Sequence, residues 1–167
     1  MKYFMAVFLC ALFTACDPAA RVDLPQPKLG VDEVLDQWHQ DAANADFEAY
    51  FSHFENEESI FMGTDETERW TIAEFRPWSK PYFDRGKAWS FEATDRWVYY
   101  NSDSTIAWFD EELATPNLGP SRGSGVLKLT PEGWKIAHYN LSIPIPNAIV
   151  GDVVRQIERA NDSLSVE

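Results

Sequence analysis

The sequence predicts an α+β domain in which helices come first and then cover one face of a mainly antiparallel, curved sheet. Two observations carry this prediction. Apolar residues recur at helical spacing in the first part of the chain, beginning at Val31. In the second half they alternate with the period of β-strands, and turn sequences separate the alternating segments. About 130 residues follow Val31, which is enough for one domain with a core of its own.

Three helices are expected before the main sheet. The first has an apolar face made of Val31, Val34, Leu35, Trp38 and Ala42. A second, short helix follows, and Asp46 is placed to cap it. Thr71 and Glu74 have the spacing of a capping box and open the third helix. Pro77 and Pro81 lie inside this third helix, so we expect a kink there or two short segments.

Five strands are expected, over Ser59–Met62, Ala88–Tyr100, Thr105–Leu113, Gly123–Leu129 and Trp134–Ile143. The charged segment Thr64–Arg69 is expected to be a loop. The last two strands form a hairpin, because Pro131 presets its own φ angle and Gly133 supplies the left-handed turn position. Asn147 is placed to cap a terminal helix that carries Ile149 and Ile157.

The last expected strand has a face that begins apolar and ends polar. Strict alternation places Trp134, Ile136, His138, Asn140 and Ser142 on this face. Such a face is typical of a pocket wall. His138 is therefore a candidate catalytic residue that shuttles protons, and Asn140 is a candidate ligand-binding residue. The alternatives are that His138 is a satisfied core or rim residue and that Asn140 caps a backbone group.

An acidic triplet follows Trp108 on the strand expected over Thr105–Leu113. Alternation places Asp110 and Glu112 on the face of Trp108. If that face looks into a pocket, Trp108 contacts the ligand and Asp110 acts as a general base. The alternative is that the strand has left the core and the triplet is solvated. We favour this alternative for Glu111 and Glu112 and leave Asp110 open.

Arg69 and Trp70 are further candidate ligand-binding residues. Arg69 can pair with a substrate carboxylate. The competing interpretation is an internal ion pair, with Glu68 or Asp110 as the partner. Trp70 can line an aromatic pocket, although tryptophans at strand and helix spacing mostly belong to the core.

Composition narrows the classes of function. The formal net charge is −13, and lysine and arginine do not cluster, so nucleic acid is excluded as a partner. No metal is expected, because the three histidines lack paired spacing. No cofactor is expected either, since neither a phosphate loop nor a dinucleotide fingerprint occurs. A nucleophile elbow is also missing.

The start of the chain predicts export. Lys2 and the apolar run Tyr3–Phe13 predict a signal peptide over residues 1–15. Phe13 to Cys16 resembles the lipobox of bacterial lipoproteins, which implies lipidation of Cys16 and contact with the membrane through that anchor only. Residues 16–30 are then an extended tether. The expected location is the bacterial cell envelope, as a periplasmic lipoprotein. The alternative is an ordinary secretory signal cut near Ala15, which gives a soluble periplasmic or secreted protein.

Several sequence blocks resemble the SnoaL-like group of the nuclear transport factor 2-like superfamily. These blocks are Phe61–Asp65, Glu68–Trp70, Ala107–Glu111, Gly123–Leu127 and Trp134–Ser142. The resemblance implies a cone-shaped fold over residues 31–160, with a flexible tail over 161–167. It also implies a pocket between sheet and helices, and a homodimer through the open sheet face. Many relatives have a histidine in place of Asn140, so a histidine-based reaction at that position is in doubt.

Three functions are consistent with the sequence. The first is an envelope-anchored domain that binds a small, largely apolar ligand without defined catalysis. The second is a cofactor-free isomerase, hydratase or hydrolase in which Asp110 is the base and His138 assists. The third is a structural or partner-binding homodimer.

Overall fold

The computed structural model describes residues 27–164. The expected signal peptide, the lipidation candidate Cys16 and most of the expected tether lie outside the described residues. Along the chain the elements are α1 (Val31–Ala43), α2 (Phe47–Ser52), β1 (Ile60–Met62), β2 (Arg69–Thr71), α3 (Ile72–Asp84), β3 (Glu92–Tyr100), β4 (Ile106–Ala114), β5 (Ser121–Thr130), β6 (Gly133–Ser142) and α4 (Val150–Leu164). This confirms the α+β prediction, and it adds β2 at the end of the segment expected to be a loop.

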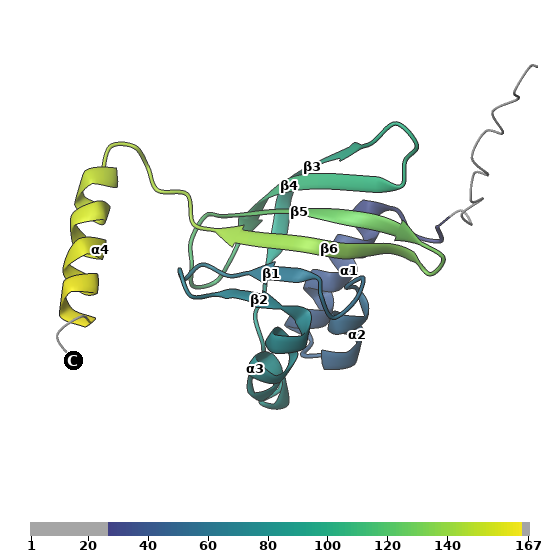
Figure 1. Cartoon of the computed structure of the whole chain (residues 1–167), viewed down its shortest axis with the longest axis horizontal. Helices are drawn as coiled ribbons and strands as arrows, with labels where there is room; N and C mark the ends of the chain where they lie inside the picture. Colours follow the sequence, from purple (N-terminus) through teal and green to yellow (C-terminus); the bar gives the residue numbers. More distant parts are fainter. Residues whose placement is uncertain (1–26, 165–167) are drawn as a thin grey trace, which may run out of the picture.

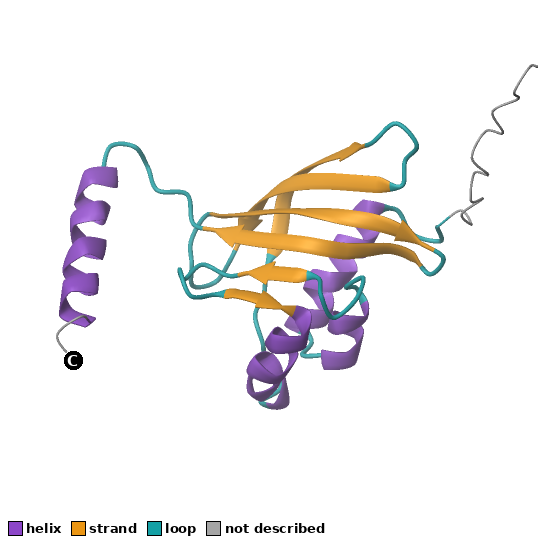
Figure 2. Ribbon diagram, in the orientation of Figure 1, coloured by secondary structure: helices purple, strands orange, loops and turns teal. Residues whose placement is uncertain are grey.

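The six strands form one curved sheet in the order β2-β1-β6-β5-β4-β3. All neighbouring strands are antiparallel except β1 and β6, which run parallel. Helices α1, α2 and α3 gather on one side of this sheet (Figure 2). We call the side that they cover the inner face and the opposite side the outer face. The cone therefore has its interior between the inner face and the three helices.

The caps of the helices follow the sequence closely. Asp46 accepts a hydrogen bond from the backbone N–H of Ala49 and caps α2. Thr71 and Glu74 form the expected capping box at the start of α3. α3 is a single helix with Pro77 and Pro81 inside it, so the alternative of two short segments was wrong. Packing of its apolar side against β1, β2 and α2 compensates for the backbone hydrogen bonds that proline cannot donate.

Aromatic rings fill the interior of the cone. Trp38 of α1 lies at the centre, with ring centroids 4.6 Å from Tyr139 and 5.3 Å from Tyr50. Phe61 of β1 stacks on Phe75 of α3 at 4.2 Å. All five side chains are buried. Each buried aromatic side chain contributes about 1.5–3 kcal/mol of hydrophobic stabilisation, so this cluster holds the helices to the sheet.

A β-bulge in β6 reverses the faces that strict alternation predicts. Ala137 is an extra residue without a partner in β5, so the pairing shifts between Ile136 and His138. The buried side chains of β6 are consequently Trp134, Ile136, Tyr139 and Leu141. His138 and Asn140 are only partly buried and lie on the outer face. The expected pocket wall with a polar end was therefore wrong from His138 onward.

Helix α4 stands apart from the rest of the molecule. Residues 143–149 connect it to β6 and run beyond the strand ends (Figure 1). α4 makes no extensive contact with any other described element.

Candidate functional site

Five of the six residues that the sequence proposed for a site lie on the outer face. Arg69, Asn140 and Asp110 lie in one row across the sheet. Met62 pairs with both Arg69 and Asn140. Ser124 pairs with both Asn140 and Asp110. The adjacent row contains His138 and Trp108, which are joined through Val126. The structure thus brings these residues together, but on the side of the sheet that faces away from the cone.

This placement removes the geometric support for Asp110 as a base inside the cone. Asp110 is partly buried and its neighbour Trp108 is exposed. His138 has a pKa below its usual value, because burial disfavours the imidazolium and the positive charge of Arg69 adds to that effect. His138 is therefore predominantly neutral at pH 7, at the surface of the sheet.

Trp70 is the predicted residue that lines the cone. Its indole lines an aromatic cleft of about 130 Å³. The walls of this cleft are Phe61, Gly63, Thr64, Glu68, Trp70, Phe75, Trp78, Tyr82, Trp89, Phe91 and Leu141. Trp70 lies 4.6 Å from Trp78, and Trp78 stacks on Tyr82 at 5.1 Å between ring centroids. Trp78 and Tyr82 are both exposed, so α3 presents aromatic surface to solvent beside the cleft.

Buried polar atoms also lie among the aromatic rings that fill the cone. The hydroxyl of Tyr50 and the indole N–H of Trp38 are buried and have no well-formed hydrogen bond among the described residues. Burial raises the pKa of Tyr50 well above its usual value, although the nearby indole groups of Trp89 and Trp38 oppose that effect. Trp89 lines the cleft, and its ring centroid lies 5.5 Å from that of Tyr50.

A buried carboxylate, Glu111, lies on the inner face of β4. Its side chain is 0% exposed. One oxygen, Oε1, lies 3.0 Å from His39 Nε2 and accepts a hydrogen bond of 3.3 Å from the hydroxyl of Tyr139. The other oxygen, Oε2, accepts a hydrogen bond of 2.9 Å from Arg96 Nε. Both carboxylate oxygens are therefore in use within the protein.

The electrostatics of this cluster keep Glu111 charged. Burial alone raises the pKa of Glu111, but hydrogen bonds and charge from His39 and Arg96 outweigh burial, so the pKa lies below its usual value. The same carboxylate helps to raise the pKa of Tyr139, which burial has already raised well above the usual range. The cluster ties α1 to the sheet, because His39 belongs to α1.

Comparison with known proteins assigns this architecture to a family. The model of the SnoaL-like domain matches residues 31–146. The chain belongs to the SnoaL-like domain family. No curated protein matches the sequence.

Solved structures share the fold of this SnoaL-like domain at low identity. An NTF2-like protein of unknown function from Pseudomonas putida has 10% identity and a TM-score of 0.57, over 70% of this chain and 86% of that one. A candidate dehydratase of the NTF2-like family from Streptomyces avermitilis has 16% identity and a TM-score of 0.58, over 70% and 94%. An NTF2-like protein of unknown function from Shewanella oneidensis has 14% identity and a TM-score of 0.56, over 67% and 95%. These similarities establish the cone-shaped fold.

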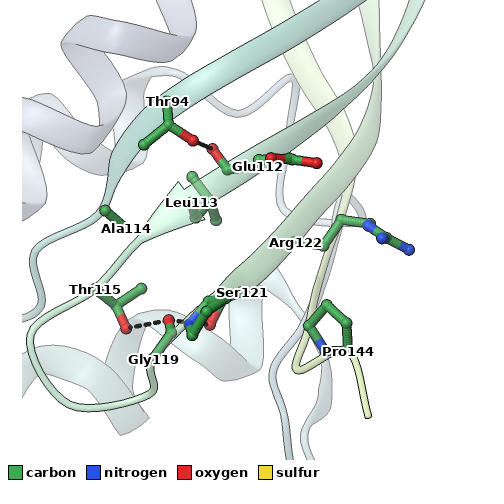
Figure 3. Close-up of a pocket in the computed structure, with 10 residues that line it drawn as sticks. Thr94, Glu112, Leu113, Ala114, Thr115, Gly119, Ser121, Arg122 and Pro144 are labelled. Carbon is green, nitrogen blue, oxygen red and sulfur yellow. Dashed lines mark hydrogen bonds between the residues drawn. The ribbon is translucent and has the colours of Figure 1, made fainter. Parts of the chain in front are cut away.

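Two of the larger hollows outside the aromatic cleft border α1 and the ends of β4 and β5. One, of about 460 Å³, lies between α1 and residues 90–93 and includes His39 in its lining. The other, of about 480 Å³, lies at the ends of β4 and β5 (Figure 3). Its loop is closed by a hydrogen bond from the Thr115 hydroxyl to the carbonyl of Gly119, and Pro144 borders it on the side of the connection to α4.

The described residues show neither a metal site nor a membrane span. No group of three or more histidine, cysteine, aspartate or glutamate side chains within residues 27–164 is placed to hold a metal ion. No helix in that part of the chain is long and apolar enough to cross a membrane.

Sequence reasoning missed the Glu111 cluster, although a signal for it exists. Ala107, Phe109, Glu111 and Leu113 occupy one face of β4, so a single carboxylate lies among apolar residues. A charge at such a position predicts a buried partner. The partner residues His39 and Arg96 come from elements that are 72 and 15 residues away, which local patterns do not reveal.

Proposed function

We propose that this SnoaL-like domain binds a small, ring-bearing apolar molecule in the aromatic cleft between α3 and the sheet, without catalysing a reaction on it. The observation that carries the proposal is the cleft itself, which has aromatic walls, exposed Trp78 at its mouth and few polar groups. Aromatic walls with a few polar groups are typical of small-molecule sites.

The size of the cleft supports a ligand of about one ring. A dry cavity of about 150 Å³ in another protein is large enough to hold benzene. The cleft is of similar volume, at about 130 Å³, and it opens to solvent beside Tyr82. A single aromatic ring or a short branched alkyl group fits this space, and the remainder of a larger ligand would extend over Trp78.

The distribution of polar groups supports binding over catalysis. Both oxygens of Glu111 are engaged by His39, Tyr139 and Arg96. Asp110 lies on the outer face and does not line the cleft. Glu68 is the only carboxylate in the cleft wall, and its Oε2 accepts a hydrogen bond from the backbone N–H of Asp65.

The experiment uses p-cresol as a probe of the cleft. Saturation-transfer NMR should show the probe bound to the purified chain, and mass spectrometry of the denatured chain should reveal any ligand carried from the cell. Trp78→Ala removes one stacking wall and should weaken p-cresol binding about five-fold, which corresponds to about 1 kcal/mol.

Trp97→Ala is the matched control for Trp78→Ala. Trp97 has similar exposure, 45% against 41% for Trp78, but lies on β3 and outside the cleft. Its substitution should leave binding unchanged. If p-cresol, indole and geraniol all fail to bind and no ligand is carried from the cell, the proposal is wrong.

We further propose that the domain is held at the bacterial cell envelope by lipidation of Cys16. The support is the position of Cys16 directly behind the apolar run Tyr3–Phe13, followed by a proline-containing segment that can serve as a tether. An anchored domain would meet apolar molecules in the periplasm. The membrane contact is then the lipid alone.

A second candidate function is a homodimer through the outer face of the sheet. The specific support is an exposed aromatic patch, made of Trp97 and Tyr99 on β3 with Ile106 and Trp108 on β4. Tyr99 stacks on Trp108 with ring centroids 6.0 Å apart and an angle of 17° between the rings. Exposed apolar patches of this kind mark interaction sites. Light scattering of the purified chain tests the dimer directly.

A further inference from the structure

A second unpartnered apolar surface lies on α4. Val150, Val153, Val154 and Ile157 follow the spacing i, i+3, i+4, i+7 and form one stripe along the helix. No side chain from Val150 to Asp162 is buried, and Ile157 is 50% exposed. An isolated helix of 15 residues is marginally stable in water, so this helix needs a surface for its stripe.

The connection to β6 holds α4 away from the sheet of its own chain. Pro144 and Pro146 fix their own φ angles and keep Ile143 and Ile145 extended. The connection runs outward past the strand ends, and α4 follows beyond them (Figure 1). A stiff connection that points outward favours a partner outside the chain.

The aromatic patch on the outer face is a surface of the matching kind. The stripe from Val150 to Ile157 is about 10 Å long at the rise of an α-helix. The patch extends over two residues of β3 and two of β4, which with their large side chains is a similar length. Trp108, at the centre of the patch, is 45% exposed. Both surfaces are present in every copy of the chain, so the stripe of each copy can cover the patch of the other.

We propose that α4 of one copy packs its apolar stripe across the aromatic patch of a second copy, and that the second copy does the same in return. The contact is isologous, so the assembly is a closed dimer and does not extend to further copies. This inference rests on the homodimer proposed above and names the element that covers the patch.

The charges of α4 argue against a membrane surface as the occupant of its stripe. Its charged side chains are Asp152, Arg155, Glu158, Arg159 and Asp162, three acidic and two basic. Helices that lie on anionic membranes are rich in lysine and arginine on the polar side. α4 contains no lysine. Packing on an aromatic protein surface does not require basic residues on the polar side of the helix.

Cross-linking between two kinds of chain tests which copy supplies the helix. Cys10→Ala with Cys16→Ala removes both cysteines of the full-length chain. On this background, one preparation carries Ile157→Cys and a second, with a different tag, carries Tyr99→Cys. A short bismaleimide reagent should join the two kinds of chain after mixing. If a chain that carries both cysteines cross-links only within itself, α4 covers its own sheet and the proposal is overturned.

Two adjacent substitutions on α4 provide the matched comparison. Ile157→Asp places a carboxylate in the stripe, and Gln156→Asp places the same group on the polar side of the helix. Ile157→Asp should weaken the dimer about ten-fold or more, and Gln156→Asp should leave it unchanged. Folding of the domain is preserved in both variants, since neither side chain is buried, and the melting temperature checks this.

The outcomes separate this inference from the homodimer itself. If Trp108→Asp dissociates the dimer and Ile157→Asp does not, the sheets pack directly on each other, and the helix contact is wrong while the homodimer stands. If the unmodified chain is a monomer at all concentrations, both proposals fail.

Discussion

Arg96 and Glu111 face each other across β3 and β4, with Arg96 Nε donating a hydrogen bond of 2.9 Å to Glu111 Oε2. Arg96 also reaches α1, where its Nη1 lies 2.8 Å from Asp36 Oδ1. A single guanidinium therefore joins the sheet to the helix that covers it. The charge of Glu111 and the position of α1 depend on the same residue.

Glu111→Gln should destabilise the protein by about 3 kcal/mol. The amide keeps the shape of the side chain but leaves the buried guanidinium of Arg96 without its buried carboxylate partner. Urea unfolding followed by circular dichroism measures the loss. Glu112→Gln, the neighbour on the exposed face, serves as the control and should change stability by less than about 0.5 kcal/mol. Equal effects at both positions would contradict the role assigned to Glu111.

The contribution of Glu111 should vanish in acid. Its folded-state pKa lies below the usual 4.5, so the folded state holds the proton less tightly than the unfolded chain does. The stabilisation is fully present above about pH 4.5 and is lost as the pH falls through the folded-state pKa. The stability difference between the native protein and Glu111→Gln should accordingly shrink below pH 4.5, as measured by melting temperatures from pH 3 to 7. A difference that stays constant over this range would refute the assignment.

Gly125→Ala should cost about 3 kcal/mol or prevent folding. A Cβ atom at this position would lie 2.3 Å from the carbonyl oxygen of His138, and that backbone is held by the bulge at Ala137. Overpacking against a fixed backbone is destabilising. Ser124→Ala, one residue earlier on the outer face, is the control and should be nearly neutral. Thermal unfolding compares the two variants.

Cys16→Ala should release the protein from membranes into the soluble periplasmic fraction. The thiol of Cys16 is the expected attachment point of the lipid, and alanine cannot carry it. Fractionation of bacteria that express each form, followed by immunoblotting, gives the answer. Cys10→Ala controls for loss of a cysteine and should remain with the membranes. A variant at Cys16 that still sediments with membranes would show that lipidation is not the anchor.

The elements of the fold could be predicted because each is encoded by local pattern. The capping residues Asp46 and Thr71 and the turn at Pro131 and Gly133 are set by neighbours a few residues away. The strand β2 escaped prediction, because its three residues pair only with β1 and their sequence carries no alternation of its own.

The site was harder to predict, because it depends on which face each strand turns inward. Asp110 and Glu111 are adjacent, and a shift by one residue exchanges buried for exposed. The bulge at Ala137 made that exchange for His138 and Asn140. Only Trp70, which pairs with buried Phe61, was assigned to the interior as the sequence suggested.

The bulge at Ala137 changes which alternate side chains of β6 are buried. Upstream of it, even-numbered residues of β6 are buried, and downstream of it odd-numbered residues are buried. Strict alternation through Ala137 would carry His138 and Asn140 into the space that Tyr139 and Leu141 occupy, whereas deletion of Ala137 together with its bulge would leave Tyr139 and Leu141 inside. The polar surface of β6 and its aromatic interior are thus kept on separate faces by one irregularity in strand pairing, which absorbs the extra residue Ala137.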